Sequence, residues 1–396
     1  MVMSSSDISL KKTMIVMLGV ITAFAPLSID LYLPALPQLS NELGISSMLA
    51  QQSLSLFFVG LATGQLFYGP LADRYGRRTP LTFGILLYLI ATVVCALAPS
   101  IDALLVGRLL QGFGAAAGPV IARAIVRDIY SGRRAAQVMS FVILVMAAAP
   151  LVAPILGGWI TALLGWRANF WVLGLFGVIC LLLVIYSIPE THPRHARPVS
   201  ALRYLFSGYL PVITDTASLP LLGAGGMAFA ALFAYVAGSP FVYTEVFGVS
   251  ETAFGYFFGL NVIGLVLGNL LNSQLVMHYG ARRLMQFGIG ILASGSACML
   301  ILVLNGVTSQ WIITPFLFIS LGTVGVIAAN TVSSLLNRHP QNAGAASALF
   351  GVSQFGLGAL SALTIGLLPF EPLLAMALVM TGSGILAVFS LLHLKR

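Results

Sequence analysis

The ten residues Gly69-Pro70-Leu71-Ala72-Asp73-Arg74-Tyr75-Gly76-Arg77-Arg78 lie at the junction of two long apolar runs, 50–72 and 79–98. Each run has about the 20 residues that a helix needs to cross a bilayer. The arginines favour the cytoplasmic side, the glycines permit a tight turn, and Asp73 can cap a nearby helix N-terminus. The stretch therefore predicts two membrane-spanning helices joined by a short cytoplasmic loop.

The same pattern returns 204 residues later, where Tyr279-Gly280-Ala281-Arg282-Arg283 follows another apolar run. Met277 and His278 stand where the first loop has its aspartate and arginine, so a charge network in the second loop should be weaker. A repeat at this distance predicts two halves of similar fold. Transporters use this architecture, with the substrate site at the interface of the halves.

The composition is that of a membrane protein. Apolar residues make up 59% of the 396 residues, charged residues only 8%, and the mean hydropathy is +1.00. Soluble proteins have about 25% charged residues, because their surface faces water. We therefore predict an all-α polytopic membrane protein with twelve transmembrane helices in two pseudo-symmetric six-helix bundles. The predicted spans are 13–36, 50–72, 79–98, 103–125, 136–164, 167–188, 218–243, 253–277, 284–304, 310–335, 343–368 and 372–393.

The basic residues orient these spans. With the N-terminus inside, 17 of the 19 Lys and Arg residues fall in cytoplasmic segments, whereas Arg167 lies outside and Arg108 within a span. Such a skew is typical of insertion that retains basic loops in the cytoplasm, and it predicts both termini there. The longest polar stretch divides the chain into an N-terminal bundle (1–188), a cytoplasmic connector (189–217) and a C-terminal bundle (218–396). The cytoplasmic basic residues are Lys11, Lys12, Arg74, Arg77, Arg78, Arg123, Arg127, Arg133, Arg134, Arg194, Arg197, Arg203, Arg282, Arg283, Arg338, Lys395 and Arg396.

The sequence lacks the features that several other classes of function require. The net charge of +8 follows from topology, because basic clusters interleaved with aromatic residues, as nucleic-acid binding needs, are absent. No G-x-x-x-x-G-K-[ST] motif is present, so direct ATP drive is not expected. A Ser–His–acid grouping or a metal-ligand set is also missing, so we expect neither an enzyme nor a bound cofactor. The three cysteines are isolated, and the histidines lie at or beyond the ends of apolar runs.

Asp30 is the one acidic residue inside a predicted span. A charge at mid-bilayer costs about 2.5–3.5 kcal/mol on the lenient insertion scale. One interpretation places Asp30 at the outer water boundary, because Pro34 and Pro37 follow soon after. The other places it in a central cavity, where burial favours the neutral acid and the carboxyl can gain a proton on one side and release it on the other.

Arg108 is the one basic residue well inside a predicted span, since Arg123 lies at the cytoplasmic end of the same span, and Gln111 shares the Arg108 helix face at i+3. Arg108 could extend to the outer interface, since it lies near the start of its span. Alternatively, it faces the cavity, where its charge would favour the ionised form of Asp30 whenever the two approach. Their separation would then load the proton.

Six stretches share the residue patterns of one transporter family. They are Ser28-Ile29-Asp30-Leu31-Tyr32-Leu33-Pro34-Ala35-Leu36-Pro37, Gly69 to Arg78, Arg108-Leu109-Leu110-Gln111-Gly112-Phe113-Gly114, Arg127-Asp128-Ile129-Tyr130, Ala149-Pro150-Leu151-Val152-Ala153-Pro154-Ile155-Leu156-Gly157-Gly158 and Pro240-Phe241-Val242-Tyr243. The second and third resemble the loop and fourth-helix motifs of the major facilitator superfamily. The fifth resembles the motif of its drug:proton antiporters. The others resemble the bicyclomycin-resistance (Bcr/CflA) branch, so the resemblance covers nearly the whole chain.

The resemblance implies roles at the matching positions. Asp73 and Arg77 would form a charge network with Asp128 that closes the cytoplasmic side in the outward-facing state. Asp30 and Arg108 would lie in or beside the cavity as the proton-coupling residues. The implied gating residues are Gly69, Asp73, Arg74, Gly76, Arg77, Arg78 and Asp128.

The fifth span has small residues and prolines at four-residue spacing. Small residues at this spacing allow close helix approach, and prolines bend a helix. Ordinary tight packing explains the pattern, and so does a hinge that seals the protein against proton leakage. The two series are Ala149, Ala153 and Gly157, and Pro150, Pro154 and Gly158.

The substrate pocket is less sharply predicted, because aromatic and amide side chains also serve ordinary packing. An apolar pocket with few fixed charges suits neutral or weakly polar amphiphiles. The candidate substrate contacts are Asp30, Tyr32, Arg108, Gln111, Tyr235, Phe241, Tyr243, Asn261, Asn330 and Gln354.

Together these features predict a proton-coupled efflux antiporter that works by alternating access. It would be a multi-pass protein of the bacterial inner membrane, working as a monomer, with protons, lipid and small drug-like molecules as its partners. An exporter of a metabolite such as an amino acid or sugar is the main alternative. A membrane enzyme and a receptor without net transport are further alternatives.

Overall fold

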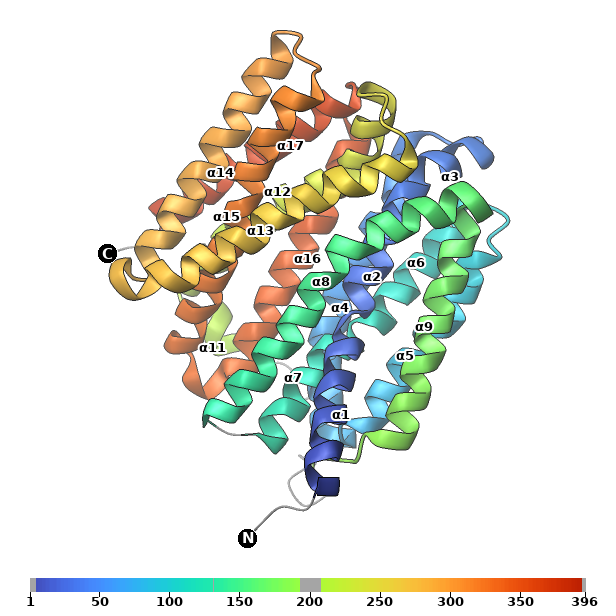
Figure 1. Ribbon diagram of the computed structural model, residues 1–396. Helices are drawn as coiled ribbons and strands as arrows, with labels where there is room; N and C mark the ends of the chain where they lie inside the picture. The colour runs from blue at the N-terminus through green and yellow to red at the C-terminus, as the bar shows by residue number, and fades with distance from the viewer. Residues whose placement is uncertain (1–4, 131, 193–207, 394–396) are drawn as a thin grey trace.

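The computed structural model describes residues 5–130, 132–192 and 208–393, and nearly all of them are helical (Figure 1). Eleven helices of this part are long and apolar enough to cross a membrane. The segments Met14–Thr22 and Phe24–Glu42, bent by 41° at their junction, make a twelfth span when taken together. The predicted all-α fold of twelve spans is confirmed. Basic residues 194, 197, 203, 395 and 396, on which part of the topology prediction rests, lie outside the described residues.

The first six spans are built from helices that alternate in direction. In Figure 1 they occupy the right side of the molecule. Their elements are α1 (Ser5–Thr22), α2 (Phe24–Asp30), η1 (Leu33–Ala35), α3 (Leu36–Glu42), α4 (Ser47–Tyr75), α5 (Arg78–Ala96), α6 (Ile101–Ala115), α7 (Ala117–Ile129), α8 (Gly132–Leu164) and α9 (Trp166–Ser187).

The other six spans follow the connector and lie on the left in Figure 1. Their elements are α11 (Leu210–Ile213), α12 (Ser218–Phe241), η3 (Val242–Val246), α13 (Glu251–Tyr279), α14 (Ala281–Leu304), α15 (Gln310–Arg338), η4 (Pro340–Asn342), α16 (Ala343–Leu367) and α17 (Pro372–Leu392). We call α1–α9 the N-half and α12–α17 the C-half. The end that carries Gly76 is called the cytoplasmic side, following the predicted topology.

Two predicted spans, 13–36 and 103–125, are broken rather than continuous helices. The first breaks after Thr22, four residues before Pro26, and the second after Ala115, four residues before Pro119. Proline has no N–H to donate to the carbonyl four residues earlier, and its ring clashes with that carbonyl. The same rule therefore explains both breaks.

The two loops of the sequence repeat have matching backbones. Gly76 ends α4 with φ of 88°, and Gly280 ends α13 with φ of 77°. A residue with a Cβ rarely adopts this left-handed conformation, so glycine is needed to turn the chain at both places. The internal repeat thus reflects a repeated helix–turn–helix unit.

The halves pack against each other along two helix pairs. The helices α4 and α16 are in contact along their length, and a methyl group at Gly351 would lie 2.9 Å from the Gln65 side chain. The helices α8 and α13 pack closely toward the outer side, where a methyl group at Gly255 would lie 2.6 Å from the Ile155 Cα. One hydrophobic core joins both halves, and a second lies within the C-half.

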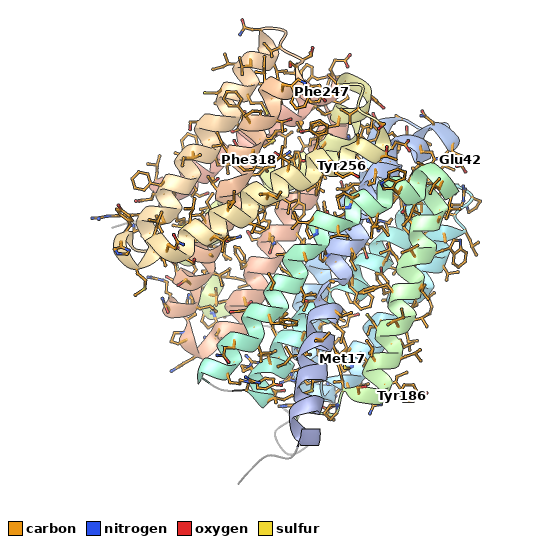
Figure 2. All side chains as sticks on the ribbon, in the orientation of Figure 1. Met17, Glu42, Tyr186, Phe247, Tyr256 and Phe318 are labelled. Atoms are coloured by element: carbon orange, nitrogen blue, oxygen red, sulfur yellow. The ribbon has the colours of Figure 1, made fainter. Side chains whose placement is uncertain are left out.

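The outer surface of the bundle is apolar, as lipid contact requires. Exposed aromatic side chains lie near both ends of the helices, where amphipathic rings favour the headgroup level. Glu42 and Tyr186 lie at opposite ends of the bundle, and side chains fill the space between the ribbons (Figure 2). The exposed end-of-helix aromatics include Trp159, Trp171 and Trp311 on the outer side and Tyr75, Tyr186 and Tyr279 on the cytoplasmic side.

Candidate functional site

Arg108 lies in the interior of the N-half, in a cage of aromatic rings. Its guanidinium carbon lies 4.7 Å from the ring centre of Tyr32, 4.2 Å from that of Phe57 and 5.9 Å from that of Phe170. The side chain is fully buried, which rules out the alternative that it extends to the outer interface. Cation–π contacts at such desolvated positions are each worth about 2 kcal/mol. The cage therefore stabilises a charge inside the membrane.

Arg108 also begins a chain of hydrogen bonds through three helices. Its Nη1 donates to the Ser28 carbonyl oxygen (3.2 Å) and to Oε1 of Gln111 (2.6 Å). Gln111 Nε2 donates to Thr92 Oγ1 (2.8 Å) on α5. The hydroxyls of Ser28 and Tyr88 are 2.8 Å apart. The predicted polar face of Arg108 and Gln111 thus holds α2, α5 and α6 together.

Asp30 ends α2, two residues after Ser28, and is 5% exposed. It is buried rather than at the outer water boundary. No hydrogen bond or ion pair joins it to Arg108 or to another residue of the described chain. The turn η1 (Leu33–Ala35), which begins three residues after Asp30, contacts α12 and α13 of the C-half. The structure therefore places Asp30 toward the interface of the halves.

A neutral polar cluster of the C-half faces this interface. Asn261 Nδ2 donates to the Tyr235 hydroxyl (3.0 Å), and the hydroxyls of Tyr243 and Thr314 are 2.8 Å apart. The rings of Tyr235 and Phe258 stack with centres 5.4 Å apart. The structure thus brings together three of the predicted substrate contacts: Tyr235, Tyr243 and Asn261.

The remaining predicted contacts are more dispersed. Asn330 Nδ2 donates to Asn272 Oδ1 (2.6 Å), which joins α15 to α13 at a distance along the helix from the Tyr235 cluster. Phe241 is fully buried near the end of α12, and Gln354 is half-buried on α16. Tyr32 lies in the Arg108 cage and bonds Ser53, with their hydroxyls 2.9 Å apart. Asn330 thus joins α13 to α15 and lies apart from the Tyr235 cluster.

On the cytoplasmic side, Arg77 joins two carboxylates. Its Nη1 donates to Asp73 Oδ1 (2.5 Å) and its Nε to Asp128 Oδ2 (2.8 Å). Burial alone lowers the pKa of the Arg77 guanidinium, but the hydrogen bonds to Asp128 and Asp73 outweigh it and raise that pKa overall. The contacts connect the α4–α5 loop to the end of α7.

Two expectations for this loop are wrong. Gly69 makes no turn, because α4 continues to Tyr75 and only Gly76 turns the chain. Asp73 caps no helix N-terminus, because it bonds Arg77 one turn ahead. Glu190 takes that position, accepting from the backbone N–H groups of Arg77 (2.9 Å) and Arg78 (3.4 Å) at the start of α5. The remaining loop residue, Arg74, lies over the Tyr75 ring at 5.1 Å.

The connector and α7 supply contacts between the halves that the sequence did not indicate. Pro70 cannot donate to the Leu66 carbonyl, and the Tyr209 hydroxyl donates to it instead (3.2 Å). On α7, Arg123 Nη1 donates to the Ser347 hydroxyl of α16 (3.2 Å). A proline inside a helix indicates that the carbonyl four residues earlier lacks its helical hydrogen bond. The sequence does not indicate which group donates to the Leu66 carbonyl instead, because Tyr209 lies 143 residues away.

The C-half has a charge cluster in a different place. Asp215, just before α12, accepts from Arg338 Nη2 (3.0 Å) and from the Ser218 hydroxyl (2.8 Å), and lies 3.1 Å from His339 Nε2. The hydrogen bonds from Arg338 hold the pKa of Asp215 well below its usual range. This cluster joins the end of α15 to the start of α12 and leaves out the α13–α14 loop.

Known proteins with similar sequences are consistent with this arrangement of helices and motifs. A profile of the Major Facilitator Superfamily matches residues 18–363. The chain belongs to this superfamily. A Bacillus subtilis (strain 168) protein named as an uncharacterized MFS-type transporter, YdgK, is 33% identical over 380 residues, 95% of this chain and 94% of the relative.

Two further relatives are named for drug resistance. A bicyclomycin resistance protein homolog of Haemophilus influenzae is 31% identical over 377 residues, 95% of this chain and 94% of the relative. A chloramphenicol resistance protein of Pseudomonas aeruginosa is 32% identical over 380 residues, 93% of this chain and 88% of the relative. These matches confirm the resemblance to the bicyclomycin-resistance branch of the superfamily.

A solved structure has the same fold with little sequence similarity. A D-xylose-proton symporter superposes with a TM-score of 0.75 at 13% identity, covering 96% of each chain. At this identity the likeness shows the major facilitator fold alone.

Two glycines of the 149–158 motif in α8, Gly157 and Gly158, allow close backbone contacts with two different segments. A methyl group at Gly157 would lie 2.1 Å from the Leu31 carbonyl oxygen, and one at Gly158 would lie 2.6 Å from the Glu251 carbonyl oxygen. Gly157 therefore packs on the residue after Asp30, within the N-half. Gly158 packs on the C-half. Pro150 and Pro154 lie inside the same continuous helix, about two turns and one turn before these glycines, respectively.

Proposed function

We propose that this member of the superfamily is a proton-coupled antiporter that exports small amphiphilic antibiotics, bicyclomycin- or phenicol-like, from the bacterial cytoplasm by alternating access. The observation that carries the proposal is Asp30: a buried carboxyl at the interface of the halves, without an ion-pair partner in the described chain. Such a group can bind and release a proton without breaking a salt bridge.

Arg108 supplies the second part of the mechanism. Its Nη1 bonds the Ser28 carbonyl, so its charge is fixed within two residues of Asp30. In the proposal, this charge favours release of the Asp30 proton whenever the two groups approach each other. A movement of the halves that changes the exposure of Asp30 then decides on which side the proton leaves. Drug and proton alternate in the same site, which couples their opposite movements.

The energy available is sufficient for useful export. A proton gradient of about 150 mV supplies about 3.5 kcal/mol per proton. At 1.36 kcal/mol per decade, one proton per drug supports a drug gradient of about 300-fold. The proposal places the protein in the inner membrane as a monomer with both termini in the cytoplasm.

In the proposal, hydrogen bonds close the cytoplasmic side and a close glycine contact closes the outer side. The Arg77 network holds the cytoplasmic ends of α4, α5 and α7 as one unit. The Arg123–Ser347 bond and the Tyr209–Leu66 bond connect that unit to the C-half and to the connector. On the outer side the contact of Gly158 with Glu251 closes the path. Alternating access requires one set to open while the other closes.

The test is uptake into proteoliposomes that contain the full chain. With the drug outside and an imposed pH gradient, radiolabelled chloramphenicol should accumulate above its external concentration, and collapse of the gradient should release it. Chloramphenicol and bicyclomycin that equilibrate without accumulation would contradict the proposal. The metabolite alternative predicts a gene deletion that leaves every drug sensitivity unchanged and raises one intracellular metabolite.

A further inference from the structure

Ser239 lies on the C-half wall of the interface and belongs to none of the sequence motifs assigned a role. It follows Tyr235 by one turn of α12, so the two side chains lie on one face of the helix. Ser239 is fully buried and Tyr235 is 1% exposed. Every residue of this part of α12, from Phe233 to Phe241, is buried.

Tyr235 is the centre of a polar group that crosses the interface. Asn261 Nδ2 donates to its hydroxyl, and Asn261 Nδ2 also lies 3.5 Å from the Tyr243 hydroxyl. The Ser239 hydroxyl lies near the Tyr235 hydroxyl without the geometry of a hydrogen bond, and the Asp30 carboxyl is close enough to interact with Tyr235 as well. Four side chains of the C-half and one carboxyl of the N-half therefore meet here.

Three members of this group have polar atoms without a hydrogen-bond partner in the described chain. They are the Ser239 hydroxyl, Oδ1 of Asn261 and the Asp30 carboxyl. All three residues are more than nine-tenths buried. Native proteins rarely leave such atoms unpaired, because the loss of their hydration is not compensated. A ligand that bonds them removes this penalty.

The chemistry of these atoms specifies the ligand. Asn261 Oδ1 and an ionised Asp30 only accept hydrogen bonds, whereas a serine hydroxyl can both accept and donate. The complementary ligand therefore carries O–H or N–H donors. A wholly apolar ligand would leave the same atoms unpaired.

The buried charges argue against a cationic ligand. Arg108 has no carboxylate partner in the described chain, and two of its nitrogen atoms, Nε and Nη2, lack hydrogen-bond partners. With Asp30 ionised the two charges balance. With Asp30 protonated, the positive charge of Arg108 remains. An organic cation would add to that positive charge in a low-dielectric region, which disfavours it.

We propose that Ser239, with Asn261 and Asp30, forms the polar wall of the substrate site and selects uncharged amphiphiles by their hydroxyl and amide donors, so that affinity rises with each donor that the wall can accept. The inference rests on the proposed function and names the substrate class of the same site. Ser239 is its specificity-determining residue, and Tyr235 positions Asn261.

The experiment compares matched compounds in proteoliposomes that contain the full chain and an imposed pH gradient. Thiamphenicol and florfenicol are both neutral, and florfenicol has fluorine in place of one hydroxyl. Tetraphenylphosphonium is the cationic probe. The wild type should take up thiamphenicol with a KM about tenfold below that for florfenicol, as expected for one buried hydrogen bond. It should accumulate tetraphenylphosphonium least.

The variant Ser239→Ala should raise the KM for thiamphenicol about fivefold to tenfold, reduce the difference between the two phenicols, and leave kcat and proton coupling unchanged. Ser296→Ala is the matched control, because Ser296 is equally buried but bonds its own helix at the Leu292 carbonyl. Equal KM values for the two phenicols in the wild type overturn the inference even if the variant fails to fold.

Other outcomes separate the inference from the proposed function. Uptake of tetraphenylphosphonium that equals that of thiamphenicol overturns the inference and leaves proton-coupled efflux intact. An unchanged KM for thiamphenicol in Ser239→Ala also overturns the inference and leaves proton-coupled efflux intact. The absence of gradient-driven uptake of all three compounds and of bicyclomycin overturns both.

Discussion

The two halves share one fold but differ in how they use charge. Asp30, Arg77 and Arg108 are the buried charged residues of the described chain, and all three lie in the N-half. The matching interior of the C-half holds amide and hydroxyl groups such as Asn261, Asn272 and Asn330. Charges inside a membrane are costly and are retained for function, whereas neutral hydrogen-bonding groups cost less. Under the proposed function, the N-half would bind and release the proton and the C-half would contact the drug.

The cytoplasmic networks show the same asymmetry. In the N-half, Arg77 is buried between two carboxylates. In the C-half, Arg338 is half exposed and pairs with Asp215 of the connector. The second loop has Met277 at the position that matches Asp73, and the charge contact of the C-half lies at the start of α12 instead. This contact involves the connector between the halves.

The largest expected effect concerns the Arg108 cage. Arg108→Lys keeps the charge but loses the planar guanidinium that stacks on Tyr32 and Phe57. We expect gradient-driven chloramphenicol uptake to fall at least about 30-fold, from the loss of about 2 kcal/mol of cation–π interaction. Initial rates in proteoliposomes measure this.

Arg167→Lys is the control for that variant. Arg167 also lies over an aromatic ring, Trp166, but at the outer surface. Its replacement should change the rate by less than about twofold, as is usual for surface pairs. Equal losses in the two variants would refute a special role of the buried cage.

The second prediction compares the two cytoplasmic networks directly. Arg77→Gln leaves two carboxylates without their partner, and removal of one partner from a buried pair costs about 3–5 kcal/mol. Arg338→Gln removes a half-exposed partner, for which about 0–1 kcal/mol is usual. We expect Arg77→Gln to lower turnover at least about tenfold and Arg338→Gln about twofold or less. Turnover in inverted vesicles, normalised to protein in the membrane, measures both; the reverse order would contradict the asymmetry.

The third prediction concerns the outer contact between the halves. In Gly158→Ala the new methyl group meets the Glu251 carbonyl oxygen, so α8 and α13 must separate. We expect transport to fall about threefold to tenfold, since overpacking of this kind costs about 1–3 kcal/mol. Cross-linking of cysteines placed at the outer ends of α8 and α13 should fall with it. Gly174→Ala, where the nearest atom is 3.8 Å from the new methyl group, should leave both unchanged.

The smallest effect is a pH dependence of stability in the C-half. Because the pKa of Asp215 is lowered in the folded protein, its pairing stabilises the fold fully above its unfolded pKa of about 4. That contribution is lost as pH falls from there through the lowered folded pKa. The melting temperature of Asp215→Asn should lie below that of the wild type at pH 7, and the gap should narrow below about pH 4. A gap that grows in acid would reverse the sign and contradict the pairing.

Much of the fold was accessible from the sequence, because hydropathy and basic residues report directly on contact with lipid and water. The breaks after Thr22 and Ala115 were not predicted, although Pro26 and Pro119 mark them once the four-residue rule is applied. Apolar length alone cannot distinguish a straight span from a broken one. The glycine turns at the two loops were visible in the repeat itself.

The site was less predictable, because a sequence gives the face of one helix and not the neighbours of that face. The shared helix face of Arg108 and Gln111 was readable from their spacing, and the structure adds a hydrogen bond between the two side chains. The direction of Asp30 toward Tyr235 depends on how the halves pack. The capping of α5 by Glu190 likewise joins residues over 110 positions apart, which no local pattern encodes.

The central claim is that Asp30 carries the exchanged proton, and Asp30→Asn tests it most directly. In proteoliposomes with an imposed pH gradient, this variant should lose accumulation of chloramphenicol but retain exchange of labelled for unlabelled drug. Asp102→Asn, which changes an exposed carboxylate at the start of α6, should behave as the wild type. Accumulation by Asp30→Asn at the wild-type level would contradict the account.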